Sequence, residues 1–182
     1  MKKLTIIAAC VTAVSAGAAF AQNVSIVEQH GWGNGQLTLQ NGANFAYTHQ
    51  GGSGNGAVTV QDGANAAGTV QEGSGNYAET IQDGANGAGT LQVGSGNVSG
   101  TYQDGFWNGS GTAQYGTDNE SYTMQDGALN GSGTLQVGEG NYSETMQDGL
   151  ANASATLQFG EDNASSTSQV GAGNSSLTIQ NN

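Results

Sequence analysis

Carboxamide side chains are the most regularly spaced polar groups in this chain of 182 residues. An Asn is followed six residues later by a Gln in fifteen copies of one frame, Asn-x-Ala/Ser-x-Thr-x-Gln, between Asn23 and Gln180; two copies depart at one position each. A carboxamide both donates and accepts hydrogen bonds, so identical residues on neighbouring strands can bond to one another in a continuous ladder. The spacing therefore predicts self-recognition and not catalysis.

We predict that the interior copies of the frame form an inward-facing amide ladder. A buried amide without a partner costs about 1–3 kcal/mol, so such a ladder has to pair every member. The predicted Gln members are Gln40, Gln50, Gln61, Gln71, Gln82, Gln92, Gln103, Gln114, Gln125, Gln136, Gln147, Gln158 and Gln169. The predicted Asn members are Asn34, Asn44, Asn55, Asn65, Asn76, Asn86, Asn97, Asn108, Asn119, Asn130, Asn141, Asn152 and Asn163.

Conventional active-site chemistry finds little support in the sequence. His30 and His49 are the only histidines; they take different positions in the repeat, so we expect them to lie far apart, and they have no Cys partner. On that basis we expect no zinc or other metal site. Serine is abundant, but no nucleophile motif with a positioned histidine occurs. We therefore expect neither an enzyme nor a bound cofactor.

Residues 1–21 have the composition of a secretory signal peptide. Lys2 and Lys3 precede an apolar stretch, and Ala19-Phe20-Ala21 has the small-x-small form of a cleavage site. We expect a mature chain, residues 22–182, that is secreted through the periplasm. An alternative is a lipoprotein cleavage box ending at Cys10, but the apolar run before Cys10 is short and continues well beyond it.

The composition of residues 22–182 excludes several classes of function. This part of the chain has no Cys, Lys or Arg, and its fourteen carboxylates face no fixed cation. Nucleic acid is excluded as a partner because its phosphates require Lys and Arg. Membrane insertion is not expected, since no other stretch approaches the roughly 20 apolar residues of a membrane helix. Large apolar residues are too few for a conventional globular core.

Two architectures fit this composition: a disordered Gly/Ser/Asn tract or a repeat fold held by β-ladders. The step from Asn to Gln never varies, whereas the step from Gln to the next Asn is four or five residues. A one-residue slip inside a strand moves every side chain to the opposite face, so only connectors tolerate such changes. Two kinds of connector alternate, so the true repeat is a pair of strands with a period of about 22 residues, as solenoid repeats have. We predict an all-β, two-sheet parallel β-solenoid (cross-β) with about seven rungs.

Strand alternation places Asn, Ala/Ser, Thr and Gln on one face and three variable residues on the other. Glu79 and Glu144 lie on the variable face, and unpaired carboxylates are not buried, so we expect the uniform face inside. A monomeric solenoid that binds ice or glycans is an alternative; ice binding would need the Thr ranks outside. One outer face carries Gly87, Gly89 and Leu91; it could pack laterally on another rod, or its glycines could merely prevent crowding.

The units Gln-x-Gly-x-Gly-Asn-x-Ala-x-x-x-Gln, as from Gln71 to Gln82, resemble the curlin repeat of bacterial curli subunits. The resemblance covers residues 23–182. It implies a secreted functional amyloid: extracellular fibres of a biofilm matrix that serve adhesion and cell aggregation. It also implies export through an outer-membrane secretion pore and nucleation at the cell surface by a second subunit.

The chain departs from the curlin pattern in three respects. Its stack is longer than is usual in the family, both strands of each rung follow one pattern, and the repeats begin almost at the predicted cleavage site. No separate export segment is therefore evident. The minor, nucleating subunit of the family tends to carry basic residues near its carboxyl end. This chain has none there, which favours the major, polymer-forming subunit.

The first and last copies of the frame predict how chains would join. The last copy contains no charge, no Pro and no Gly, which gives an open strand of high β-propensity. We expect such edges to add further chains by templated stacking, so that the chain is its own principal partner. The predicted assembly edges are Asn23, Gln29, Asn174, Leu177, Ile179 and Gln180.

One kind of connector carries Asp-Gly, which predicts a column of carboxylates roughly 5 Å apart. We interpret these residues as charge brakes that delay assembly. The alternatives are plain turn chemistry and a calcium-binding column. The residues are Asp62, Asp83, Asp104, Asp126 and Asp148.

Overall fold

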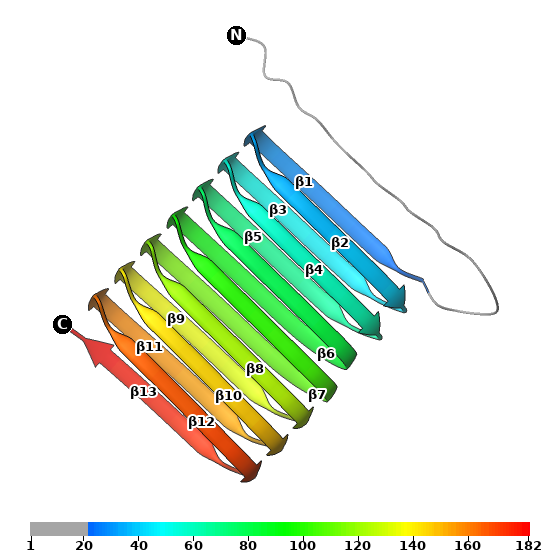
Figure 1. Cartoon of the computed structure of the whole chain (residues 1–182), viewed down its shortest axis with the longest axis vertical. Coiled ribbons are helices and arrows are strands. Elements are labelled where there is room, and N and C mark those ends of the chain that lie inside the picture. The colour runs from blue at the N-terminus through cyan, green and yellow to red at the C-terminus, as the bar shows by residue number, and fades with distance from the viewer. Residues whose placement is uncertain (1–21) are drawn as a thin grey trace.

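The computed structural model describes residues 22–182, which form thirteen β-strands (Figure 1). This part of the chain contains no helix long and apolar enough to cross a membrane. The predicted signal peptide lies outside the described residues. The strands are β1 (Val24–Trp32), β2 (Gly35–Gly42), β3 (Phe45–Ser53), β4 (Gly56–Gly63), β5 (Ala66–Ser74), β6 (Tyr77–Ser95), β7 (Val98–Thr117), β8 (Glu120–Ala128), β9 (Gly131–Glu139), β10 (Tyr142–Leu150), β11 (Ala153–Glu161), β12 (Ala164–Ala172) and β13 (Ser175–Asn181).

The strands stack in two parallel series. Sheet I consists of β1, β3, β5, the second half of β6, the second half of β7, β9, β11 and β13. Sheet II consists of β2, β4, the first half of β6, the first half of β7, β8, β10 and β12. The chain alternates between the sheets, so neighbouring rungs follow one another from blue to red in Figure 1. The predicted two-sheet parallel β-solenoid of about seven turns is confirmed.

Equivalent positions of the frame lie opposite one another on neighbouring rungs. Gln82, for example, pairs with Gln103, and Gln103 pairs with Gln125. The register shifts between Ala85 and Gly87, where the facing connector on the next rung is one residue longer. The additional residue is Trp107, which takes a left-handed conformation with φ of 63°. The longer repeat is thus absorbed in a connector, and the strands keep their register.

The interior is almost entirely polar. The only buried hydrophobic residues in the described chain are Ala46, Ala57, Ala67 and Ala78; apart from Gly51, every other buried residue is Asn, Gln, Ser or Thr. Glu79 lies on the outer face, as predicted. The uniform face of the frame is therefore inside. The Thr ranks that an ice-binding surface would present are buried, which removes the geometric basis of that alternative.

A glycine stands two residues after the Gln of every frame up to Gln169, and it allows the connectors to stack closely. Gly105, for example, has φ of 108°, a conformation that L side chains rarely adopt. A Cβ atom added there would lie 2.0 Å from the backbone oxygen of Gly127 on the next rung. Both the backbone conformation and the close approach of the next connector therefore require glycine at this frame position.

Candidate functional site

Gln side chains form one continuous ladder in each sheet. Each Gln donates from Nε2 to Oε1 of the Gln on the next rung, over donor–acceptor distances of 2.6–2.9 Å. The ladder of sheet I runs from Gln29 to Gln180, and that of sheet II from Gln40 to Gln169. Each amide is thus both donor and acceptor, as the sequence predicts.

The second hydrogen of the Gln amide joins the two sheets. Gln92 of sheet I donates to the backbone oxygen of Tyr77 in sheet II at 2.9 Å, and Gln103 of sheet II donates to that of Gly87 in sheet I at 3.2 Å. The same pattern recurs from Gln40 to Gln180. The Gln ladders therefore hold the sheets together as well as the rungs, which sequence reasoning did not foresee.

Asn side chains form ladders that run in the opposite direction. Asn97 donates from its backbone N–H and from Nδ2 to Oδ1 of Asn76, on the preceding rung, at 3.1 and 3.0 Å. Its Nδ2 also donates to the backbone oxygen of Gly116 in the connector above, at 3.0 Å. The Asn column thus fixes the connectors while it pairs the rungs. The two amide columns give the stack a direction, because Gln donates forward and Asn donates backward.

Thr and Ser fill the space between the two amide columns, and many of their hydroxyls make no hydrogen bond. Thr90 and Ser99 face each other across the sheets at 3.5 Å between oxygens, and Thr112 and Ser121 do so at the same distance. Among the described residues, the buried hydroxyls without a partner are those of Thr48, Ser110, Thr123, Ser132, Thr134, Ser143, Thr145, Ser154 and Thr156. The small volume of these side chains, and not hydrogen bonding, accounts for their place in the interior.

Both edges of the described stack leave the ladders open. At β1, no described residue donates to Oε1 of Gln29; at β13, Gln180 donates only across to the backbone oxygen of Ala164. Asn174 accepts from no described residue at its Oδ1, although it donates to Asn152 below. The predicted edge residues Leu177 and Ile179 are 66% and 63% exposed.

The predicted Asp column is present as a geometric feature. These carboxylates lie opposite one another on five successive rungs and are exposed at the connectors. The column begins beside Asn41, whose Nδ2 donates to Asp62 at 3.0 Å, and it ends where Val170 takes the position. Its members are Asp62, Asp83, Asp104, Asp126 and Asp148. Its effect on assembly remains a prediction.

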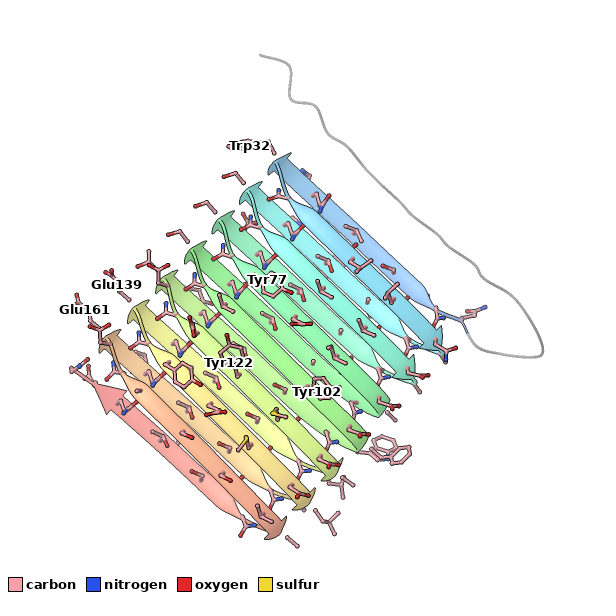
Figure 2. The ribbon with its side chains drawn as sticks, viewed as in Figure 1. Trp32, Tyr77, Tyr102, Tyr122, Glu139 and Glu161 are labelled. Carbon is pink, nitrogen blue, oxygen red and sulfur yellow. The ribbon has the colours of Figure 1, made fainter. Side chains whose placement is uncertain are left out.

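The outer face of sheet II is aromatic and acidic, and Figure 2 shows three of its tyrosines along the stack. The rings of Tyr122 and Tyr142 are 6.2 Å apart between centroids. Burial raises the pKa of the Tyr122 phenol, and the Glu120 carboxylate and Tyr142 raise it further. Burial likewise raises the pKa of Tyr77, with Glu79 as the second cause.

From the second half of β6 to β11, the outer face of sheet I is instead small and apolar in the middle of the strands. A shallow groove crosses it, lined by residues that include Gly89, Leu91, Gly111, Gly133 and Leu135. A Cβ atom added at any of the three glycines would meet no atom within 4 Å. Crowding within the chain therefore does not explain the glycines of this face.

The expectation that the two histidines lie far apart is wrong. The rings of His30 and His49 are 5.5 Å apart between centroids, because both sit at one corner of adjacent rungs. His49 lies opposite Glu28 of the preceding rung, and Gly51 lies opposite His30. The sequence holds this information, because residues one strand pair apart, such as Glu28 and His49, lie opposite one another once the rungs are stacked.

Comparison with known proteins gives no relative from which a function could be transferred: no protein-family model matches the chain, and no curated protein matches it in sequence.

Proposed function

We propose that this chain is the major structural subunit of an extracellular, curli-like amyloid fibre. The observation that supports the proposal is continuity: the amide ladders pass through the whole described stack and end open at β1 and β13. Parallel strands with stacked amides and closely packed small side chains are the architecture of cross-β fibres. A further chain can therefore use the same bonds that join the rungs of one chain.

The direction of the ladders favours head-to-tail stacking. Because sheet I has one strand more than sheet II, a stack without gaps places β1 of the next chain on β12 and its β2 on β13. Gln180 of one chain would then donate to Gln40 of the next, and Asn34 of that next chain would donate to Asn174 of the first. In the reverse orientation, donors would face donors and acceptors would face acceptors. A head-to-tail contact is heterologous and does not close, so repeated addition gives a filament.

The biological setting of the proposal rests on the curlin-like repeat. We infer secretion through the periplasm and an outer-membrane pore, nucleation by a second subunit, and service in biofilm matrix, surface adhesion and cell aggregation. The role of major subunit, in preference to that of nucleator, rests on the absence of Lys and Arg from residues 22–182.

Fibre formation by the purified chain is the direct test. We expect dilute chain to form fibres with thioflavin T fluorescence, fibrils in electron micrographs and a meridional reflection at about 4.7–4.8 Å. Gln180→Ala should slow growth on wild-type seeds more than it alters the monomer's circular dichroism, with Asn182→Ala as control. A monomer that persists in the ultracentrifuge would contradict the proposal and favour a monomeric secreted binder. Equal growth of Gln180→Ala would contradict the edge mechanism alone.

The Asp column gives a test of the rate of assembly. In low salt, Asp83→Asn with Asp104→Asn should shorten the lag before fibre growth, because stacked like charges oppose one another. Glu79→Gln with Glu144→Gln changes the net charge equally, but neither Glu faces a carboxylate on a neighbouring rung. Equal lags in the two double variants would reject the charge brake and leave the column as turn chemistry.

A further inference from the structure

One corner of the N-terminal rungs gathers the chain's only imidazoles beside two carboxylates. Glu28 and His30 extend from β1, His49 from β3 and Glu72 from β5. Parallel pairing places His49 opposite Glu28, and it places Gly51 between His30 and Glu72 in the neighbouring column. Three successive rungs therefore contribute to a single cluster on the outer face of sheet I.

The side chains of this cluster converge. His49 Nδ1 is 3.3 Å from Glu28 Oε2, and His49 Nε2 is 2.9 Å from Glu72 Oε1. One ligand atom from each of Glu28, His30 and His49 lies within 4.8 Å of the other two. Tyr47 supports the arrangement by donating from its hydroxyl to Glu28 Oε2 at 3.4 Å.

Gly51 provides the space that lets Glu72 reach His49. A Cβ atom at Gly51 would lie 2.2 Å from Glu72 Oε2, so any side chain there would displace the carboxylate. The Glu72 side chain thus occupies the space over Gly51 and reaches the imidazole of His49. With no Lys or Arg in residues 22–182, no fixed cation neutralises these two carboxylates.

We propose that Glu28, His30 and His49 bind a divalent first-row transition-metal ion. Two imidazole nitrogens and one carboxylate oxygen form a donor set that suits Zn²⁺ and Cu²⁺, with Cu²⁺ the tighter by the general order of stability. The ion binds at the Nδ1 side of His49, next to Glu28, and Glu72 accepts from the Nε2–H on the other side of the ring. Glu72 is thus a positioning residue, since a carboxylate behind a metal-bound imidazole fixes its tautomer and orientation.

The exposure of the ligands permits the small adjustment that binding needs. Bonds of about 2.0–2.1 Å in a tetrahedral site place the donor atoms about 3.3 Å apart, closer than some are here. The side chains of Glu28 and His49 are 51% and 23% exposed, so rotation about their own bonds can bring the atoms together. Because the ligands come from β1 and β3, the ion would link the first strand of sheet I to the second.

Metal titration of the secreted chain, purified without a histidine tag, tests this site independently of fibre formation. We expect one equivalent of Cu²⁺ to bind, with nitrogen hyperfine structure from two imidazoles in the electron paramagnetic resonance spectrum, and Zn²⁺ to compete. His30→Gln, His49→Gln and Glu28→Gln should each weaken binding at least about tenfold, and Glu72→Gln less. The Glu79→Gln, Glu144→Gln double variant is the control, with carboxylates lost from the other sheet.

Stability provides the second measurement. Saturating Zn²⁺ should slow amide hydrogen exchange in β1 of the wild-type chain but not in His30→Gln, since a ligand stabilises the state that binds it. The substituted side chains are on the outer face, and circular dichroism will show whether the variants keep the wild-type fold. Binding that is unchanged in both His variants, or a Cu²⁺ spectrum without nitrogen couplings, would overturn the proposal.

Discussion

Two kinds of residue column run along this solenoid, and they obey different rules. Columns that touch copies of themselves, the interior amides and the connector glycines, hardly change from rung to rung. Columns on the outer faces of the strands vary more: the position of Tyr77 is taken by Val98 on the next rung and by Glu120 on the one after. A column keeps one residue type along the stack where each residue contacts the equivalent residue on the next rung. The same contact can then be made at every rung.

Substitution of a connector glycine should have the largest effect on the fold among substitutions in these columns. Gly94→Ala places a methyl group 1.8 Å from the backbone oxygen of Gly116, at φ of 129°. We expect this substitution to prevent the local stacking of rungs, seen as loss of β-structure by circular dichroism and rapid amide exchange around residue 94.

Gly89→Ala is the matched control for that prediction. Gly89 lies on the outer face of sheet I, and an added Cβ atom there meets nothing within 4 Å. We expect it to leave stability unchanged or to raise it slightly, since alanine restricts the unfolded chain more than glycine does. Similar behaviour of the two variants would show that contact with the next rung does not determine which glycines are required.

A central Gln should show the next largest effect. Gln103→Ala removes the acceptor of Gln82 Nε2 and the donor to Gln125 Oε1. Each of these buried amides keeps the ladder bond on its other side, to Gln61 and to Gln147, but has one polar group unpaired. Each unpaired polar group costs about 1–3 kcal/mol, so we expect the free energy of unfolding to fall by at least about 2 kcal/mol. Urea unfolding of fresh monomer measures this free energy. Tyr102→Ala is the comparison, because Tyr102 is the neighbouring residue and is half-exposed. A smaller loss in Gln103→Ala than in Tyr102→Ala would refute the importance of the ladder.

Most of the fold could be predicted from the sequence because the repeat itself specifies it. The alternating connectors indicate the strand pairs, the alternation within strands indicates the buried face, and Glu79 and Glu144 decide which face is inside. The bonds between sheets could not be predicted in this way. Whether the second hydrogen of Gln92 reaches Tyr77 depends on the separation and stagger of the sheets, and a repeat pattern leaves both undetermined.

The histidine cluster shows a different limit of sequence reasoning. The expectation that His30 and His49 lie apart rests on their different positions in the strand frame, which are irrelevant once connectors and strand ends from adjacent rungs meet at one corner. Comparison at the period of a full rung aligns Glu28 with His49 and His30 with Gly51. The sequence therefore predicts the histidine cluster only when residues are compared one full rung apart, and not one strand apart.

The Thr columns differ from the amide columns, since they are interior but do not hydrogen-bond to equivalent residues on neighbouring rungs. Thr134 Oγ1 is buried and has no hydrogen-bond partner. Thr134→Val keeps the branched shape and removes the unsatisfied hydroxyl, so we expect the free energy of unfolding to stay equal or to rise by about 1 kcal/mol. Urea unfolding beside Thr90→Val, whose hydroxyl faces Ser99 at 3.5 Å, provides the control. A loss of more than about 1 kcal/mol in Thr134→Val would mean that the hydroxyl is bonded in solution.

The smallest effect belongs to the outer face of sheet II, where interactions differ from rung to rung. The pKa of Tyr122 is raised, first by burial and then by Glu120 and Tyr142, so the folded chain holds this proton more tightly than the unfolded chain does. The resulting stability is fully present below the usual tyrosine pKa of about 10 and is lost as the pH rises through the folded value. Tyr122→Phe should match the wild type in urea at pH 8 and lose less stability between pH 9 and pH 11. Parallel losses in both chains would show that this outer column, unlike the amide columns, has no influence on the stability of the stack in this pH range.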